Sequence, residues 1–285
     1  MKFSIKNVTL LIFTDIDGTF IDNDTFDKGL NAKTVSELEQ AQHLVVFNTS
    51  KTFDEVNNFQ KKIKTSLSFI CETGGGIYLA NDHLRITDSS RGAYQVLYES
   101  RKINEHKDQI QFEINKSYRE DLTFFDNLSV EEQSSLSGLS GHDLELASRR
   151  DFSILFKWKS TKSKYDEFTL FLKKLKLNLI TGGRFSHICS EHDKGRATKL
   201  FTDKTKKFFK NSNIVTVGIG DSKNDFEMLN VVDFPCVVKS PNNHPLQDSL
   251  NSKNITFSEH EAPTGWTDCI QKVITKIKSS ETTNV

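Results

Sequence analysis

Four aspartates in two distant parts of the chain have the type and spacing of a metal-assisted catalytic site. Asp15 and Asp17 directly follow the apolar run at residues 8–13, and Asp221 and Asp225 follow a second apolar run near the other end of the chain. Short continuous apolar runs are typical of buried parallel strands, and open α/β sheets bind ligands at the carboxyl ends of such strands. Carboxylates gathered there need a positive partner, usually a divalent metal ion. Either segment alone could be an acidic turn, but the two together favour one shared site.

Strand-like and helix-like segments alternate along the chain, which predicts an α/β fold with a parallel sheet covered on both faces. Apolar runs predict strands, and apolar residues at helical spacing, as in 31–42, predict helices. Thr52 with Glu55, and Ser222 with Asp225, have the spacing of capping boxes. The expected strands are 8–13, 44–47, 67–70, 152–158, 177–181, 214–219 and, as the last, 234–238; the expected helices are 31–42, one that begins after Thr52, 165–175, 194–209 and 225–230.

The middle of the chain differs from its two ends in composition and in the pattern of apolar residues. Charged helical stretches and a Ser/Gly-rich patch at 134–141 interrupt the alternation of strands and helices. We therefore expect residues 87–187 to form an inserted α/β domain, and residues 1–86 and 188–285 to form one discontinuous core domain. The polar tail at 279–285 is expected to fray.

Composition limits the class of partner. The 285 residues contain 38 Lys+Arg and 38 Asp+Glu, and this zero formal net charge argues against a general nucleic-acid-binding protein. The four cysteines include no Cys-x-x-Cys pair, which favours free thiols in a reducing compartment over a zinc site. Neither a signal peptide nor a membrane span is predicted. We expect a cytoplasmic protein, monomer or homodimer, that acts on a small molecule rather than on a nucleic acid or a membrane.

The two acidic segments resemble the first and fourth motifs of the haloacid dehalogenase superfamily of phosphotransferases. They read Asp-x-Asp-Gly-Thr at 15–19 and Gly-Asp-Ser-x-Asn-Asp at 220–225, and both match every defining position. Thr49 resembles the hydroxyl residue of the second motif, with Ser50 as the alternative, and Lys194 resembles the cation of the third; both would contact phosphoryl oxygens. The resemblance implies a Rossmann-like core with a parallel sheet and an inserted α/β cap of the C2 type, as in subfamily IIB.

The same resemblance assigns a role to each acid. Asp15 would be the nucleophile that forms an aspartyl-phosphate, which splits hydrolysis into two easier steps. Asp17 would protonate the leaving alcohol and then deprotonate the attacking water. Mg²⁺ would be held by Asp15, the backbone carbonyl of Asp17 and Asp221. Asp225 belongs to the same metal group, and we also expect it to cap its helix and to orient Lys194 or a metal-bound water.

Further segments resemble the mannosyl-3-phosphoglycerate phosphatases of that superfamily. The segment at 49–52 reads Thr-Ser-Lys-Thr, a signature of this family where most cap-bearing relatives have Thr-Gly-Arg. Two departures lie near the expected substrate pocket, because Thr73 stands where the family has Asn and residues 154–155 replace Glu-Pro. The other matching segments, in the order of the family, are 22–26, 137–140, 147–153, 182–187 with 193–195, and 262–266.

The implied substrate, 2-O-mannosyl-3-phosphoglycerate, carries a phosphate, a carboxylate and a hexose; its hydrolysis would give mannosylglycerate, a compatible solute. Arg149, Arg150 and Arg184 could clamp the carboxylate, because guanidinium groups bind planar anions through paired hydrogen bonds. Adjacent residues face different ways, so we expect one of Arg149 and Arg150 to be structural. His187 could bind substrate or could simply be packed. The remaining residues assigned to substrate binding are Ser50, Lys51, Gly74, Gly75, Gly183 and Asn224, although the glycines could equally form a plain turn.

Other substrates and one other enzyme class remain open from the sequence. The alternatives are a glucosyl-3-phosphoglycerate, sucrose 6-phosphate or another sugar phosphate. A phosphomannomutase would share this kind of core and cap. A degenerate phosphatase kept as a binding module is disfavoured because Asp15, Asp17, Lys194, Asp221 and Asp225 are all present.

Overall fold

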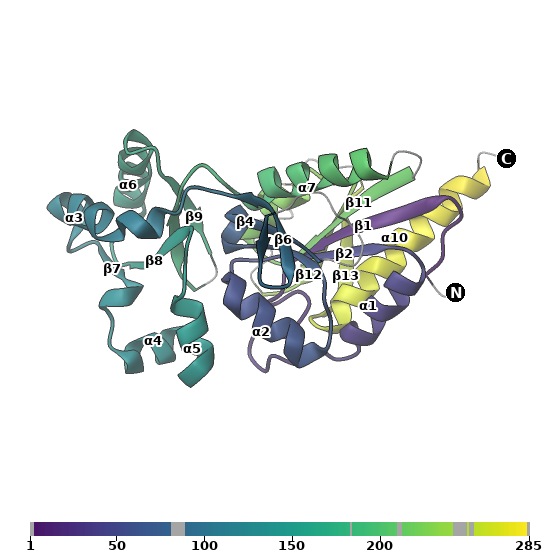
Figure 1. Ribbon diagram of the computed structural model, residues 1–285, viewed down its shortest axis with the longest axis horizontal. Helices are drawn as coiled ribbons and strands as arrows, with labels where there is room; N and C mark the ends of the chain where they lie inside the picture. The colour runs from purple at the N-terminus through teal and green to yellow at the C-terminus, as the bar shows by residue number, and fades with distance from the viewer. Residues whose placement is uncertain are drawn as a thin grey trace.

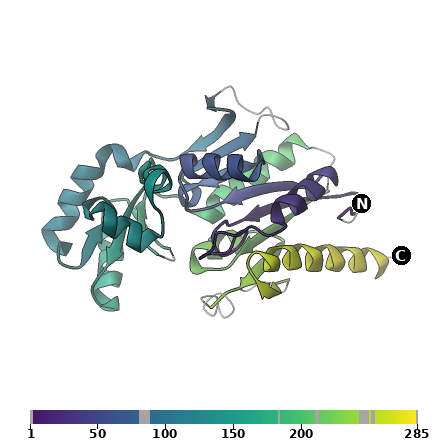
Figure 2. The same ribbon diagram turned by 90° about the horizontal axis from the view of Figure 1, so that it is seen from below.

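The computed structural model describes residues 3–80, 89–182, 184–209, 213–241, 250 and 254–283. Two α/β units lie next to each other along the long axis of the molecule, and each is built on its own sheet (Figure 1). Both chain termini lie at the end of the larger unit that is remote from the smaller one (Figures 1 and 2). The prediction of an α/β core with a parallel-dominated sheet and an added cap is confirmed.

The larger unit, the core, has a sheet of nine strands. Its strands are β1 (Val8–Thr14), β2 (Leu44–Asn48), β3 (Ser68–Cys71), β4 (Gly76–Ala80), β5 (Ser90–Arg91), β6 (Tyr94–Glu99), β11 (Asn213–Gly220), β12 (Phe234–Lys239) and β13 (Thr256–Glu261). The strand order is β13-β12-β11-β1-β2-β3-β4-β6-β5. The first six strands in this order run parallel, and β4, β6 and β5 add antiparallel pairs at one edge.

Helices cover both faces of the core sheet, which explains the continuous apolar sequence of β1. Leu10 and Ile12 pack in a cluster with α1 (Asn31–Gln40), α2 (Phe53–Ile63) and α10 (Thr264–Thr283). Leu11 and Phe13 point the other way, into a cluster with α7 (Lys194–Phe208) and α8 (Phe226–Leu229). Alternate side chains of a strand face opposite sides of a sheet, so a strand buried on both faces must be apolar throughout. Figure 2 shows α10 lying along the sheet.

The smaller unit, the cap, has four strands in the order β7-β8-β10-β9, all antiparallel. They are β7 (Leu122–Phe124), β8 (Ser153–Trp158), β9 (Asn178–Thr181) and β10 (Ser186–Cys189). Two helices, α3 (Lys107–Tyr118) and α6 (Lys162–Lys174), pack their apolar residues on this sheet in one cluster. A second, smaller cluster includes Leu144 of α5 (Gly141–Ser148), which follows α4 (Val130–Ser137).

The strand pairing places the border between the two units elsewhere than the sequence suggested. The expected border at 86/87 lies outside the described residues, but beyond it β6 pairs with β4 and β5 pairs with β6, so both belong to the core sheet. At the return, the border expected at 187/188 would divide β10, all of which pairs in the cap sheet. Backbone hydrogen bonds join these short strands to their sheets, and local composition does not reveal which strands pair.

Two further differences concern the end of the chain. The strand expected to be last, β12, is followed by β13, in which only Thr256 and Ser258 are buried. A strand with polar residues even at its buried positions gives no apolar signal. The tail expected to fray from residue 279 continues α10 as far as Thr283. The capping box of Thr52 with Glu55 and that of Ser222 with Asp225 are both confirmed.

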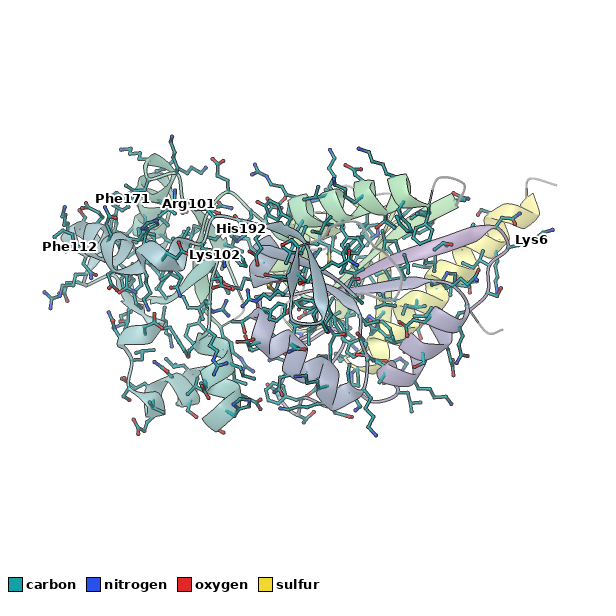
Figure 3. The ribbon with its side chains drawn as sticks, viewed as in Figure 1. Lys6, Arg101, Lys102, Phe112, Phe171 and His192 are labelled. Atoms are coloured by element: carbon teal, nitrogen blue, oxygen red, sulfur yellow. The ribbon has the colours of Figure 1, made fainter. Side chains whose placement is uncertain are left out.

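No helix in the described part of the chain is long and apolar enough to cross a membrane. The four cysteines are all free and buried. Figure 3 places His192 at the junction of the two units, whereas Phe112 lies at the far end of the cap and Lys6 at the far end of the core.

Candidate active site

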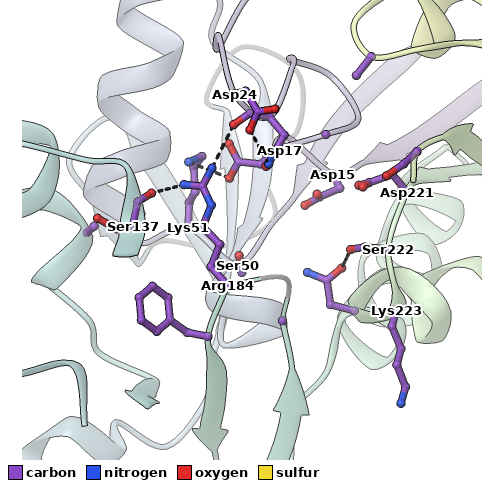
Figure 4. A pocket seen from close by; sticks show the side chains of 18 of the residues that line it. Asp15, Asp17, Asp24, Ser50, Lys51, Ser137, Arg184, Asp221, Ser222 and Lys223 are labelled. Atoms are coloured by element: carbon purple, nitrogen blue, oxygen red, sulfur yellow. Dashed lines mark hydrogen bonds and ion pairs between the residues drawn. The ribbon is translucent and has the colours of Figure 1, made fainter. Parts of the chain in front are cut away.

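The carboxyl ends of β1 and β11 bring the predicted acids together. The strands are parallel neighbours with Thr14 opposite Ile219, and the backbone N–H of Asp15 donates to the carbonyl of Ile219 at 3.0 Å. Asp15 and Asp221 are the first residues after these strands, so both carboxylates start from the same edge of the sheet (Figure 4). Side-chain oxygens of Asp15, Asp221 and Asp225 all lie within 4.8 Å of one another, and all three residues are buried. The two acidic segments therefore meet, as their positions predicted.

Gly18 and Thr19 fix Asp221 from the first acidic segment. The φ angle of Gly18 is +74°, and a Cβ there would stand 2.8 Å from Oδ2 of Asp221. Thr19 donates through Oγ1 to Oδ1 of the same carboxylate at 2.9 Å. Glycine is the residue that allows both the left-handed turn and the close approach. The Gly-Thr pair of the motif is thus explained by its contact with the second acidic segment.

Lys194 joins two of the acids. It is the first residue of α7, whose N-cap is Asp193, and its side chain is fully buried. Its Nζ donates to Oδ1 of Asp15 at 2.7 Å and to Oδ1 of Asp225 at 2.7 Å. The other oxygen of Asp225, Oδ2, accepts the backbone N–H groups of Asp221 at 3.1 Å and Ser222 at 3.2 Å. Asp225 therefore caps the turn and orients Lys194 at the same time.

Burial controls the electrostatics of this cluster. Burial raises the pKa of Asp15 to about 7, although the ammonium of Lys194 acts in the opposite direction. The pKa of Asp221 is also raised well above its usual range, mainly by burial and then by the charge of Asp225. Burial lowers the pKa of Lys194, but the carboxylates of Asp15 and Asp225 outweigh it and hold that pKa above its ordinary value. Three buried acids with one ammonium are thus short of positive charge.

The donor set fits a divalent cation. Its atoms are carboxylate oxygens, which are the ligands that Mg²⁺ prefers. Among the described residues, no donor contacts Oδ2 of Asp15 or Oδ2 of Asp221, whereas both oxygens of Asp225 already accept hydrogen bonds. Asp15 and Asp221 are therefore the two carboxylates that still have an oxygen to offer a metal ion.

Asp17 faces the mouth of the site and pairs with Lys51. Nζ of Lys51 lies 2.9 Å from Oδ2 of Asp17 and 3.9 Å from Oε1 of Glu55. Burial lowers the pKa of Lys51, but the charges of Asp17 and Glu55 outweigh it and raise the pKa above its usual value. Oδ1 of Asp17 is buried and has no partner within the described residues. Lys51 was assigned to substrate binding, and in this structure its ammonium holds the acid that would serve the leaving group.

The two hydroxyl residues after β2 differ in where they face. Ser50 lines the large cavity described below. Thr49 is 1% exposed, does not line that cavity, and accepts the backbone N–H of Lys51 through Oγ1 at 3.2 Å. The Thr49 oxygen accepts this bond and keeps its own O–H available to donate, so the phosphoryl role stays a prediction for Thr49, with Ser50 as the alternative that lines the cavity.

A cavity of about 670 Å³ opens between the core and the cap above the acidic cluster. Its volume is within the range of small-molecule sites. The cations that line it include Lys51, Arg150 and Arg184, and the acids that line it are Asp15, Asp17, Asp22, Asp24, Glu55, Asp221 and Glu261. The remaining predicted substrate residues in its wall are Ser50, His187 and Asn224.

Of the two adjacent arginines, only Arg150 lines the cavity. Its guanidinium donates from both terminal nitrogens to the carbonyl of Ser50 at 3.2 Å, and its Nε is buried without a partner within the described residues. Arg149 is exposed and pairs with Glu145 at 2.5 Å and Asp54 at 3.4 Å. We expected one of the two arginines to be structural, and Arg149 is that residue. Its side chain points away from the cavity because the side chains of consecutive residues point in different directions.

Arg184 and His187 approach the cavity from the cap. Arg184 donates to the carbonyl of Ser137 in the cap and to the carbonyl of Asn23 in the core at 3.1 Å, so it bridges the two units. Burial lowers the pKa of His187 to about 3, and the charge of Arg150 acts in the same direction. His187 is therefore neutral, and its Nδ1 is buried without a partner within the described residues.

The glycines assigned to substrate binding have another explanation. A Cβ at Gly74 would stand 2.2 Å from the carbonyl oxygen of Asp193, and one at Gly75 would stand 2.4 Å from Cβ of Phe152. Neither glycine lines the cavity. Their small size allows close packing where the core meets the chain segments that connect it to the cap, so substrate binding by Gly74 and Gly75 is not supported by their position. Gly183 lies outside the described residues.

Glu72 was not singled out from the sequence, yet it joins the core to the start of the cap strand β8. Its carboxylate accepts the backbone N–H groups of Asp151 at 2.9 Å and Phe152 at 3.0 Å, and the hydroxyl of Ser153 at 2.7 Å. Burial raises the pKa of Glu72, and the nearby Arg150 acts against that rise. A lone glutamate beside glycines gives no signal of such a role, because its partners are far away in the sequence.

Comparisons with known proteins agree with this geometry. The haloacid dehalogenase-like hydrolase family matches residues 12–247. The chain is 29% identical to the glucosyl-3-phosphoglycerate/mannosyl-3-phosphoglycerate phosphatase of Methanococcoides burtonii over 269 residues, which is 93% of this chain and 97% of the relative. It is 30% identical to the mannosyl-3-phosphoglycerate phosphatase of Pyrococcus furiosus over 231 residues, which is 80% of this chain and 90% of the relative.

A solved structure shares the fold. A phosphatase of the HAD enzyme superfamily from Bacteroides thetaiotaomicron superposes with a TM-score of 0.67 at 11% identity, covering 95% of this chain and 96% of its own. The matched family spans the acidic segment after β1, Lys194 and the acidic segment after β11, which are the parts that form the buried cluster. The chain therefore belongs to the haloacid dehalogenase-like hydrolases.

Proposed function

We propose that this protein is a Mg²⁺-dependent phosphatase that hydrolyses a glycosyl-3-phosphoglycerate, with the mannosyl compound as first choice and the glucosyl compound as the close alternative. The coarser statement, that the chain is a phosphoric monoester hydrolase, follows from its family and from relatives named as phosphatases. The observation that carries the mechanism is the contact of Lys194 with Asp15 at the floor of a cavity whose lining includes Lys51, Arg150 and Arg184.

Asp15 is the nucleophile of the proposed reaction. An oxygen of its carboxylate forms a bond to phosphorus while the bond from phosphorus to the substrate oxygen breaks. Lys194 holds the other oxygen and lowers the repulsion between the anionic nucleophile and the phosphate. Asp17 gives its proton to the departing alcohol, then takes a proton from the water that attacks the aspartyl-phosphate. This second step releases phosphate and restores both aspartates.

Asp15 and Asp221 are the residues proposed to hold Mg²⁺, with the backbone carbonyl of Asp17 as a further ligand. When bound, the ion supplies positive charge to the phosphoryl group and to the nucleophile. Asp225 supports the site by holding Lys194 and the turn after Asp221. We therefore propose that Asp225 acts mainly by orienting Lys194 and the turn after Asp221, and less as a direct ligand of the metal ion.

The cations of the cavity support a substrate with a second anionic group. Arg150 and Lys51 lie in the cavity wall together with Arg184 of the cap. A glycerate carboxylate next to the phosphate would use such cations, whereas a plain hexose phosphate has one anionic group only. Two relatives named for glycosyl-3-phosphoglycerates support the same choice. We place the activity in a reducing, cytoplasmic compartment, which fits the four free cysteines.

Phosphate release from a panel of phosphate esters tests the proposal. The panel contains mannosyl- and glucosyl-3-phosphoglycerate, sucrose 6-phosphate, mannose 6-phosphate and 3-phosphoglycerate, each with Mg²⁺. The highest kcat/KM is expected for a glycosyl-3-phosphoglycerate. A clear preference for a plain sugar phosphate would overturn the glyceryl assignment, and an Asp15→Asn variant with near-native turnover would overturn the aspartyl-phosphate route.

A further inference from the structure

We propose that Phe26 is the core's platform for the sugar ring of the substrate, so that the glycosyl group binds between Phe26 and an aromatic wall of the cap. The inference rests on the proposed function and adds a specificity-determining residue to it. Phe26 lies on the short loop at 22–27, directly after the catalytic segment, and lines the cavity.

The backbone of Phe26 has an uncommon conformation for its residue type. Its φ angle is +58°, in the left-handed region that bulky residues rarely adopt, and its side chain is 40% exposed. An aromatic side chain kept both in a strained conformation and in contact with solvent contributes little to packing. Strain of this kind gathers where the geometry serves a ligand.

The loop is fixed without the help of the Phe26 ring. Oδ1 of Asp22 accepts the backbone N–H groups of Asp24 at 3.1 Å and Thr25 at 2.7 Å, and also the Thr25 hydroxyl at 2.7 Å. The backbone N–H of Phe26 donates to the carbonyl of Asp22 at 3.1 Å. These bonds hold the turn through its backbone and its polar side chains. The ring at position 26 is therefore presented by the loop and does not stabilise it.

The cap contributes apolar residues to the cavity lining, beside its polar residues Arg150, Arg184 and His187. Phe125 and Phe185 pack edge to face with ring centroids 5.1 Å apart, and Leu139 and Leu155 line the cavity beside them. Within the described residues, no ring contact joins Phe26 to either cap phenylalanine, although all three line the same cavity. A hexopyranose has apolar C–H faces that pack on aromatic rings and hydroxyl edges that need water or polar groups. A cavity that offers aromatic side chains from both the core and the cap, beside polar residues, matches those needs.

Arg184 connects the loop of Phe26 to the cap. Its guanidinium donates to the carbonyl of Ser137 in the cap and to the carbonyl of Asn23, which stands three residues before Phe26. Figure 4 shows Arg184 reaching from the cap toward the loop of Asp24 and the side chain of Asp17. This bridge uses one N–H of each terminal nitrogen and ties the Phe26 loop to the cap, while the other N–H groups of Arg184 stay available to the cavity.

The test compares two substrates that differ only by the sugar. Mannosyl-3-phosphoglycerate and 3-phosphoglycerate have the same phosphate ester and the same carboxylate, so the ratio of their kcat/KM values reports the sugar site. The variants are Phe26→Ala and Phe26→Gly, and the matched control is Phe112→Ala, an exposed phenylalanine (63% exposed) at the far end of the cap. Product inhibition by mannosylglycerate and by phosphate gives a second readout that measures binding alone.

Both Phe26 variants are expected to lose roughly threefold to tenfold in kcat/KM for the glycosyl substrate, the size expected from losing an aromatic contact, with little change for 3-phosphoglycerate. Inhibition by mannosylglycerate should weaken by a similar factor, and inhibition by phosphate should not change. Phe26→Gly should melt at a higher temperature than Phe26→Ala, because only glycine relieves the left-handed strain. Phe112→Ala should match the wild type on both substrates.

Equal losses in kcat/KM on both substrates, or unchanged inhibition by mannosylglycerate, would overturn the assignment of Phe26 as the platform for the sugar. Full recovery of sugar selectivity in Phe26→Gly would also overturn it, because the backbone and not the ring would then carry the effect. A wild-type enzyme that prefers a plain hexose phosphate would refute the proposed function separately. The same variants would then be compared on that hexose phosphate and on glycerol 3-phosphate, with the same selective loss expected.

Discussion

The ammonium of Lys194 lies 2.7 Å from Oδ1 of Asp15, with both side chains buried at the carboxyl ends of the core strands. The same ammonium contacts Asp225 at 2.7 Å, so one cation orients the nucleophile and the turn that carries Asp221. These contacts join segments that are far apart in the sequence. A site built in this way depends on the whole core being folded. Lys194 both orients Asp15 and stabilises the turn through Asp225, so a mutation of Lys194 would remove both contacts together.

Lys194→Met should abolish phosphate release, with a loss of several orders of magnitude, because the nucleophile loses its orienting cation. It should also lower the free energy of unfolding by about 3–5 kcal/mol, since buried carboxylates are left without their partner. Both are measured by steady-state phosphate release and by urea unfolding. Lys199→Met, at an exposed position of the same helix, is the control and should resemble the wild type. Near-native turnover of Lys194→Met would contradict its assigned role.

Asp17→Asn should affect substrates according to their leaving groups. Alkyl phosphates need a proton on the departing oxygen, so their hydrolysis should fall by roughly two to four orders of magnitude. An aryl phosphate such as p-nitrophenyl phosphate needs less protonation, and it should still phosphorylate Asp15. Rapid-quench measurement of the first turnover tests this point. Equal losses on both substrate types would argue against Asp17 as the general acid.

Arg150→Ala and Arg149→Ala form a matched pair of adjacent substitutions. Arg150 lines the cavity and Arg149 pairs on the surface with Glu145 and Asp54. Arg150→Ala should lower kcat/KM for a glycosyl-3-phosphoglycerate by at least tenfold, the size of about 1.5–3 kcal/mol for a hydrogen bond to a charged group, and should have a smaller effect on p-nitrophenyl phosphate. Arg149→Ala should leave both values near those of the wild type. The reverse ranking would show that the exposed arginine binds substrate.

Metal removal should stop activity, and Mg²⁺ should stabilise the free enzyme. A cation that neutralises Asp15 and Asp221 binds the folded state only, so saturation at about one hundred times the dissociation constant should add about 2.7 kcal/mol to the free energy of unfolding. Thermal melting with and without Mg²⁺ measures this gain. Asp221→Asn should lose most of it. Ca²⁺ should not restore activity, because it accepts additional oxygen ligands and would misdirect the nucleophile. Full turnover in excess chelator would remove the metal from the mechanism.

Buried neutral histidines should make stability depend on pH. Burial lowers the pKa of His187 to about 3 and that of His192 to about 4, below the ordinary value of 6.5. Below pH 6.5 both histidines therefore bind protons in the unfolded chain but stay neutral in the folded chain. Their contribution to the free energy of unfolding is complete above pH 6.5 and declines as the pH falls toward 4. Each histidine adds a slope of up to about 1.4 kcal/mol per pH unit. The raised pKa values of Asp15 and Asp221 act in the opposite direction over this range. The histidine contribution is therefore measured by urea unfolding between pH 7.5 and 5 as the difference between the wild type and a histidine variant.

A His192→Asn variant should have a smaller slope over that range. The exposed His142→Asn variant should keep the slope of the wild type, because its side chain is already in water. A His192→Asn variant whose unfolding free energy has the same slope as the wild type from pH 7.5 to 5 would contradict the neutral state of the buried His192.

Local sequence determined most of the core and the identity of the reacting groups. The apolar run of β1, the capping box at Thr52 and the acids at 15, 17, 221 and 225 each follow from residue type and spacing within a few positions. Because parallel strands end at one edge of a sheet, the meeting of Asp15 with Asp221 could be predicted without coordinates.

Only the tertiary structure decided which neighbours face the substrate and which support the fold. Arg149 and Arg150 are adjacent and alike in type, yet only the folded arrangement, in which α5 packs against α2 of the core, turns one outward and the other into the cavity. Gly74 and Gly75 are small because Asp193 and Phe152, far away in the sequence, lie against them. Polar strands such as β13 and long-range partners such as those of Glu72 give no local periodicity, so their places are set by hydrogen bonds that form only when the chain has folded.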